Sequence, residues 1–475
     1  MMNTTMRKTL LLFIILPLAV IQNSAQTLGT PRSDSALEET FWGLSVQDAT
    51  TGEELVGVRS HHLMTPASTM KVVSTATALS MLSPSTRIPT EVLTDGQISG
   101  NTLKGNLWII GHGDPSIGSR YLWGKDQEQF FKEVVSALRT KQISTIEGDI
   151  IAYIPESDFQ GLNPHWPAYD MGNHYAAGAF ALNVYDNSYS IHFTDFGQNF
   201  YTDPEVPDLK LTARYGFTRE RSSDSLYVSP FPLADTSYPI TGVYPVNVPK
   251  LRIRASIPNP PLFFTQETMR VLEKGGISVS GAATTSWQEP SAPSTLHVYL
   301  SPTLYELART TNIYSHNLFA ESLLRLVGRD RTPLPGHNGT QTSIMALREY
   351  WAGRGLNMRE LEMRDGSGLS PEDRVTPYFL AAILGKAYRG DPSHALMRTM
   401  PLAGKEGTLT IFLKNTPLEG KALLKSGSIR NVICYTGYVE HKGKVYTMAL
   451  MVNNFYGRSS NVRKAMEQIL LDVFN

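Results

Sequence analysis

Cysteine is almost absent from this chain of 475 residues, which contains only Cys434. A protein with a single cysteine cannot form an internal disulfide, so its stability must come from burial of a hydrophobic core. Cys434 lies in the apolar run 432–435, a pattern typical of a buried strand. A catalytic thiol is the alternative, but the apolar surroundings favour a structural cysteine.

The chain also lacks any run of basic residues. Its 43 lysines and arginines equal its 43 aspartates and glutamates. A protein that binds nucleic acid or an anionic bilayer through charge presents a basic patch or stripe. The composition therefore argues against both kinds of partner, and it does not indicate an oligomeric state.

The hydrophobic run at the N-terminus is too short to span a bilayer, which takes about 20 residues. The run covers residues 9–21, and Arg7 and Lys8 precede it. A positive start, a short apolar run and a polar stretch ending at Ala25 are typical of a cleaved signal peptide. We therefore expect a signal peptide at residues 1–25, export to the periplasm or cell envelope, and no transmembrane anchor in the mature chain.

The order of predicted elements indicates an interrupted domain. A hairpin at 41–58 and a helix from Ser68 to Leu82 open the sequence. Residues 85–295 show short β-like runs separated by glycine, proline, asparagine and aspartate. Longer elements then return, with helices at 304–310, 317–327, 343–351, 377–388 and 461–474, a strand at 422–425 and a hairpin at 432–452. This order predicts an α+β fold whose two ends form one domain around a large, mainly β insertion.

The segment Ser68–Lys71 places a serine and a lysine one helical turn apart at the start of the first predicted helix. That spacing puts both side chains on one face, where the lysine amine can accept the serine proton. The helix N-terminus also stabilises negative charge that develops nearby. An N-cap serine followed by a solvated lysine gives the same pattern, so the segment alone is weak evidence for a nucleophile.

Two further segments carry the same ambiguity. Ser315 and Asn317, on either side of His316, open a predicted helix, where Ser315 could simply be an N-cap. A predicted strand ends in a glycine where a substrate backbone could approach closely, or where the chain simply turns. That strand end consists of Lys425, Ser426, Gly427 and Ser428.

Together and in this order, the segments resemble the S-x-x-K, S-x-N and K-[TS]-G motifs of penicillin-binding proteins and serine β-lactamases. The long stretch between Ser68 and Ser315 is similar to that of low-molecular-mass class C penicillin-binding proteins, the D-alanyl-D-alanine carboxypeptidase/endopeptidase family. His316 and Ser426 depart from the residues that this family carries more often. Further segments resemble the same family, at Gly111–Pro115, Ala181–Asn187, Asp365–Ser370, Pro401–Gly404 and Gly407–Leu409.

The resemblance implies a transpeptidase-like catalytic domain built from residues 31–84 and 296–475. Residues 85–295 would form an inserted accessory region of two nested β-rich domains. The partners implied are peptidoglycan stem peptides and β-lactam antibiotics. Neither a metal ion nor an organic cofactor is needed for the implied chemistry.

The resemblance also assigns roles to single residues. Lys71 would activate Ser68, which attacks the carbonyl of the penultimate D-alanine and forms an acyl-enzyme. Backbone N–H groups of Ser68 and Ser428 would stabilise the oxyanion, and Ser315 would pass a proton to the leaving amine. Substrate binding would fall to Asn317, Lys425, Ser426, Gly427 and Ser428.

Other interpretations remain open. A β-lactamase shares the serine chemistry, although its first two motifs lie closer together. A non-catalytic peptidoglycan-binding protein is the second alternative, and the intact Ser68 and Lys71 argue against it. We expect His316 to pack or to face solvent, and Asp365 and Ser367 to shape a turn.

Overall fold

The structure is a computed structural model, and it describes residues 28–32, 37–122, 124–158, 160–219, 226–233 and 236–475. The predicted signal peptide at residues 1–25 lies outside the described residues. Within the described part of the chain, no helix combines the length and the apolar composition that crossing a bilayer requires.

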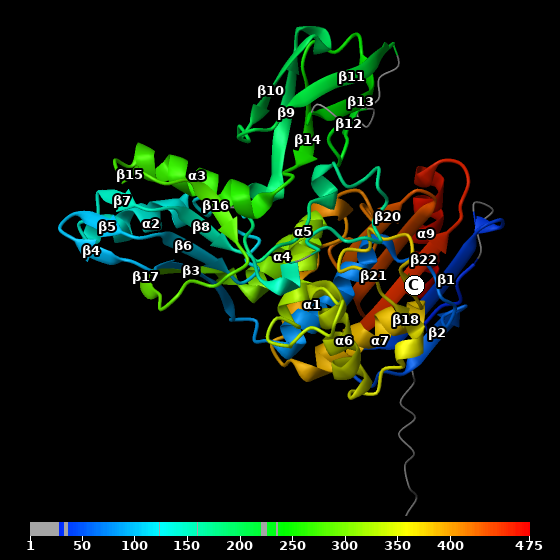
Figure 1. The fold of residues 1–475 in the computed structure, drawn as a ribbon. Coiled ribbons are helices and arrows are strands. Elements are labelled where there is room, and N and C mark those ends of the chain that lie inside the picture. The colour runs from blue at the N-terminus through cyan, green and yellow to red at the C-terminus, as the bar shows by residue number, and fades with distance from the viewer. Residues whose placement is uncertain (1–27, 33–36, 123, 159, 220–225, 234–235) are drawn as a thin grey trace, which may run out of the picture.

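A five-stranded antiparallel sheet joins the two ends of the chain. The N-terminal strand pairs along its whole length with a strand from the C-terminal hairpin, so blue and red strands lie side by side in Figure 1. The last strand in the order forms one edge of this sheet. The order is β2 (Glu54–Val58), β1 (Phe41–Asp48), β22 (Lys444–Asn453), β21 (Val432–His441) and β20 (Ala422–Ile429).

Helices cover both faces of this sheet because its central strands alternate between two cores. Cys434 and Met451 face one core, which α1 (Met70–Met81), α4 (Leu304–Tyr314), α5 (Asn317–Leu326), α6 (Gly339–Ala352), α7 (Pro377–Gly390) and α8 (Ala395–Thr399) complete. Ile433 and Leu450 face the other, against α9 (Ser459–Val473). A strand that is buried on both sides has apolar residues at successive positions, which explains the apolar run at 432–435. Cys434 is buried, as the sequence predicted.

The inserted segment leaves and re-enters the body through two paired strands, β3 (Arg87–Thr94) and β17 (Ser294–Thr303). They belong to a sheet with β16 (Ala283–Ser286), β8 (Ile150–Tyr153) and β6 (Leu107–Gly111). A smaller sheet holds β15 (Ser278–Val279), β7 (Thr145–Glu147), β5 (Thr102–Lys104) and β4 (Gln97–Ser99). Figure 1 shows this unit projecting away from the body.

Two three-stranded sheets are nested within the insertion, between β8 and β15, and stand apart from the larger sheets in Figure 1. One consists of β10 (Asn199–Asp203), β9 (Ser188–Thr194) and β14 (Leu251–Ser256). The other consists of β11 (Leu211–Thr218), β13 (Tyr238–Pro245) and β12 (Leu226–Val228).

The structure has the predicted α+β class, and the main helices and the hairpins lie where the sequence pattern indicated. The insertion also contains two helices that the sequence analysis did not predict. α2 (Gln129–Thr140) buries Phe130, Phe131, Val134 and Leu138, which follow the helical period. α3 (Pro260–Lys274) begins after Asn259, whose side chain accepts a hydrogen bond from Leu262 N.

Candidate active site

Ser68 and Lys71 meet at the start of the first helix. Ser68 lies in a 3-10 turn, η2 (Ala67–Thr69), and α1 begins directly after it. Ala67 has φ +47°, so a tight turn precedes the helix that the sequence placed from Ser68. The spacing nevertheless brings the two side chains together, and Lys71 Nζ donates a hydrogen bond of 2.8 Å to Ser68 Oγ.

Lys71 is fully buried, which is unusual for a lysine. Its second hydrogen bond goes to the carbonyl oxygen of Ser367 at 2.7 Å. Burial lowers the pKa of Lys71 to about 7, although the nearby carboxyl groups of Asp365, Glu321 and Asp373 oppose this shift. Because a general base works best with a pKa near the operating pH, this lysine is suited to accept the Ser68 proton.

The second motif forms the junction between α4 and α5. Ser315 ends α4 in the left-handed conformation, with φ +56°. Lys425 Nζ, from strand β20, donates a hydrogen bond of 2.8 Å to Ser315 Oγ. Lys425 Nζ also donates a hydrogen bond to the carbonyl oxygen of Ser426. Burial lowers the pKa of Lys425 well below its ordinary value, and Lys71 adds to the shift.

The inserted segment contacts both of the other residues of this motif. Asn317 Nδ2 donates a hydrogen bond of 2.6 Å to the carbonyl oxygen of Tyr175. The ring of His316 packs against Tyr121, with 4.6 Å between ring centroids, and its Nε2 lies 3.5 Å from Asp186 Oδ1. His316 therefore packs against the insertion, which is one of the two positions we expected for it.

Gly427 allows strand β20 to lie directly against the turn that carries Ser68. A Cβ atom at this position would lie 2.6 Å from the Pro66 carbonyl oxygen and 2.9 Å from Ser68 N, closer than real Cβ atoms approach. The glycine is thus required by packing. Ser426 Oγ shares a hydrogen bond of 2.7 Å with Thr408 Oγ1, and Ser428 is exposed.

The loop between β18 (Leu361–Glu362) and β19 (Arg374–Val375) completes the surroundings of Lys71. It contains Asp365, whose carboxylate accepts hydrogen bonds from the backbone N–H groups of Gly368 and Ser370 at 2.6 and 2.8 Å. This is the turn that the sequence led us to expect. The contact between Lys71 and the Ser367 carbonyl was not foreseen, because backbone acceptors leave no signal in residue types.

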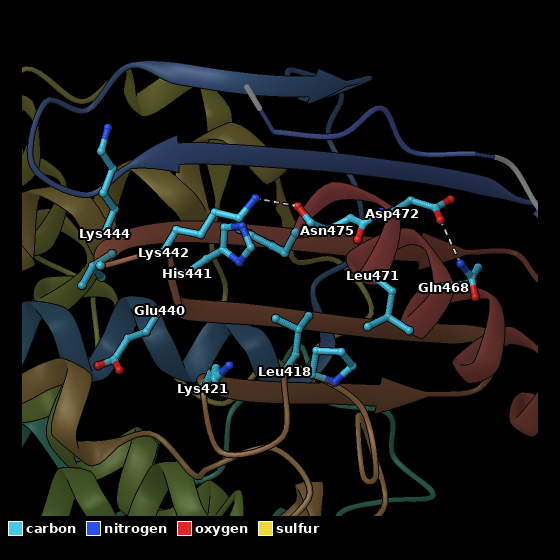
Figure 2. A pocket seen from close by; sticks show the side chains of 14 residues that line it. Leu418, Lys421, Glu440, His441, Lys442, Lys444, Gln468, Leu471, Asp472 and Asn475 are labelled. Carbon is cyan, nitrogen blue, oxygen red and sulfur yellow. Dashed lines mark hydrogen bonds between the residues drawn. The ribbon is translucent and has the colours of Figure 1, made fainter. Parts of the chain in front are cut away.

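A separate hollow of about 910 Å³ contains none of the predicted site residues. It lies between the turn that joins β21 to β22 and the end of α9, as Figure 2 shows. Lys442 Nζ donates a hydrogen bond of 3.0 Å to the Asn475 carbonyl oxygen at its rim. Despite its volume, this hollow contains none of the residues that the three motifs identify, so it is not a competing candidate for the active site.

Comparison with known proteins identifies relatives along almost the whole chain. The model of the D-Ala-D-Ala carboxypeptidase 3 (S13) family matches residues 25–473. A D-alanyl-D-alanine carboxypeptidase of Actinomadura sp. (strain R39) is 25% identical over 86% of this chain and 76% of that protein. The D-alanyl-D-alanine carboxypeptidase DacB of Haemophilus influenzae is 23% identical over 82% of this chain and 81% of its own length.

Solved structures share the fold. Penicillin binding protein 4 of Haemophilus influenzae superposes with a TM-score of 0.77 at 21% identity, covering 91% of this chain and 96% of that one. The same protein has been solved in complex with a β-lactam. A predatory peptidoglycan endopeptidase from Bdellovibrio bacteriovorus has a TM-score of 0.51 at 14% identity, over 92% of this chain and 93% of that chain.

The pKa of Lys71 predicts how reactivity depends on pH. Only the neutral amine accepts a proton, so the base is present above the pKa and is lost as the pH falls through about 7. The rate at which Ser68 is acylated, measured with penicillin across this range, should fall with decreasing pH. This fall is the acidic limb of the pH profile. The variant Lys71→Ala should react ~10² to 10⁴ times more slowly and without this limb. An unchanged limb in the variant would mean that another group is the base.

Proposed function

Because the chain belongs to the D-Ala-D-Ala carboxypeptidase 3 (S13) family, it is a serine-type DD-peptidase, and we propose that Ser68 is its nucleophile and Lys71 its general base. The observation that carries this assignment is the 2.8 Å hydrogen bond from a fully buried lysine to the serine hydroxyl. A serine hydroxyl needs such a base because it is a weak nucleophile at neutral pH.

In the proposed acylation step, Ser68 Oγ attacks the carbonyl of the penultimate D-alanine while its proton moves to Lys71. The C–N bond to the terminal D-alanine then breaks, and Ser315 passes a proton to the leaving amine. Lys425 supports this role because its ammonium donates to Ser315 Oγ at 2.8 Å and orients that hydroxyl. Water later hydrolyses the ester, so the net reaction consumes one water molecule.

We propose that the oxyanion binds between the backbone N–H groups of Ser68 and Ser428. The close approach that Gly427 permits between β20 and the turn η2 supports this pairing. Preorganised donors of this kind contribute roughly 3 to 4 kcal/mol each to the transition state in comparable enzymes. A side chain at position 427 would push the two donors apart.

Substrate binding is proposed to use the same edge of the sheet. The terminal carboxylate would meet Lys425 and the hydroxyls of Ser426 and Ser428, while Asn317 would hold the substrate amide. The hydrogen bond between Ser426 and Thr408 adds a residue of the segment Gly407–Leu409, to which the motif analysis gave no role. Thr408 would fix the orientation of the Ser426 hydroxyl toward the substrate.

The proposed ligands are peptidoglycan stem peptides and β-lactams. The relative from Haemophilus influenzae that was solved with a β-lactam bound has the same fold. A strained lactam carbonyl would acylate the same activated serine. Such substrates lie outside the cytoplasm, so the proposal includes export to the periplasm or cell envelope.

We also propose the division of the chain into a catalytic domain, residues 31–84 and 296–475, and an inserted accessory region, residues 85–295. The pairing of β3 with β17 supports it, because the chain enters and leaves the insertion at neighbouring positions. The contact of Asn317 with Tyr175 indicates that the insertion also helps to position the site.

Incubation with purified muropeptides tests the proposed function. Monomers that end in D-Ala-D-Ala should lose one D-alanine, and crosslinked dimers should yield monomers if the enzyme also cuts crosslinks. Mass spectrometry of the products distinguishes the two activities. The Ser68→Ala variant is the control, and turnover by that variant, or no product from either substrate with the folded wild type, would refute the assignment.

A second variant separates carboxylate recognition from the chemical step. Lys425→Ala should weaken turnover of substrates with a free terminal carboxylate ~10- to 150-fold, since a charge-assisted contact is lost. An activated ester without a carboxylate should lose less activity, because it does not use that contact. Some loss is still expected, because Ser315 loses its hydrogen-bond partner in the variant. The exposed Lys444→Ala serves as the control and should leave both rates unchanged. Equal losses for both substrates would show that Lys425 does not bind the carboxylate.

A further inference from the structure

Three buried carboxyl groups surround Lys71, and the proposed reaction uses none of them. Glu321 lies on α5 and is 2% exposed, while Asp365 and Asp373 lie in the loop between β18 and β19 and are fully buried. All three attract the Lys71 ammonium electrostatically. Buried carboxyl groups are costly unless they are paired or neutralised, so their presence here needs a physical account.

Glu321 is connected to Lys71 through two consecutive residues of this loop, Gly366 and Ser367. Both of its carboxylate oxygens accept from the backbone N–H of Gly366, each at 3.0 Å. The carbonyl oxygen of the next residue, Ser367, accepts the Lys71 hydrogen bond. Ser74 on α1 donates to the Gly366 carbonyl at 2.7 Å and so contacts the same two-residue segment. Glu321 therefore fixes the backbone that orients the Lys71 amine.

The helix geometry explains why Glu321 reaches this position. It follows Asn317 by one helical turn on α5, so the two side chains lie on the same side of the helix. Asn317 is the last residue of the S-x-N motif that begins with Ser315. Glu321 lies further along the helix, against the loop between β18 and β19. The same helix thus serves the substrate side and the buried side of the site.

The three carboxyl groups differ in what stabilises their charge. Asp365 accepts hydrogen bonds from three backbone N–H groups and one indole N–H group, all at 3.0 Å or less. These donors stabilise a negative charge on its carboxylate. Asp373 accepts Arg364 N through Oδ1, but its Oδ2 has no donor. Burial and the neighbouring Asp365 raise the pKa of Asp373 well above its ordinary value.

Glu321 is the carboxyl group that titrates in the same range as the base. Burial raises the pKa of Glu321 to about 8, and Asp365 adds to the shift. Glu321 is therefore mostly uncharged where Lys71 titrates, at a pH of about 7. The other titratable groups that face Lys71 are Asp365, Asp373 and Lys425 on β20.

We propose that Glu321 is a positioning residue that sets the orientation of the Lys71 amine, because it holds the segment Gly366–Ser367, whose Ser367 carbonyl oxygen accepts from Lys71. This inference rests on the proposed role of Lys71 as the base. The Ser68 proton goes to the Lys71 amine, and Glu321 does not touch the substrate.

The test measures the rate constant of Ser68 acylation by a fluorescent penicillin as a function of pH. Glu321→Gln keeps an oxygen for Gly366 N–H but removes the charge, so its plateau rate should stay within about threefold of wild type. Its acidic limb should stay at the wild-type pH, because a glutamate with a pKa of about 8 is already mostly uncharged where Lys71 titrates, at about 7. Glu321→Ala removes the acceptor as well and should lower the plateau ~10-fold or more.

Asp114→Asn is the matched control. Asp114 is a buried carboxyl group of the insertion that is 1% exposed and accepts a backbone hydrogen bond from Ser116. Its substitution should change neither the plateau nor the limb.

A plateau in Glu321→Gln as low as that of Glu321→Ala would show that the hydrogen bond to Gly366 N–H does not position Lys71. A wild-type plateau in Glu321→Ala would refute the positioning role. If the alanine variant does not fold, Glu321→Leu, which fills more of the space but has no acceptor for Gly366 N–H, gives the same test. Failure of the wild type itself to be acylated at any pH would instead overturn the assignment of Ser68 and Lys71.

Discussion

The burial of one lysine is the constraint on which the rest of the site depends. Lys71 must be free of its proton to accept one from Ser68, and loss of hydration is what brings its pKa to about 7. The same burial would be too costly without hydrogen-bond partners, which Ser68 Oγ and the Ser367 carbonyl provide at 2.8 and 2.7 Å. The surrounding carboxyl groups then limit how far the pKa falls.

The fold supplies this burial by bringing together segments that are distant in the sequence. The pairing of β1 with β22 places the start of α1 against the C-terminal sheet, where β20 runs past the turn that carries Ser68. Ser315 at the end of α4 and Glu321 on α5 close the site from another side, and the insertion contributes Tyr175. A change in any of these contacts would alter the surroundings of Lys71 without touching the reacting atoms.

Sequence analysis predicted the α+β class and most elements of the body, because their apolar periodicities are strong. It also pointed to Ser68, Lys71, Ser315 and Lys425, whose residue types carry the chemistry. It did not predict α2 and α3, although the spacing of Phe130 to Leu138 could have indicated the first. Glu321 was missed because a buried glutamate on a helix looks like a solvated one until its tertiary contacts are known.

The most direct test of the account is where penicillin attaches. Incubation with benzylpenicillin followed by proteolysis and mass spectrometry should locate a stable acyl adduct on Ser68, because this hydroxyl is the one held by the buried lysine. The Ser68→Ala variant should remain unmodified under the same conditions. An adduct on another residue, or none in a folded sample, would contradict the central claim that Lys71 activates Ser68.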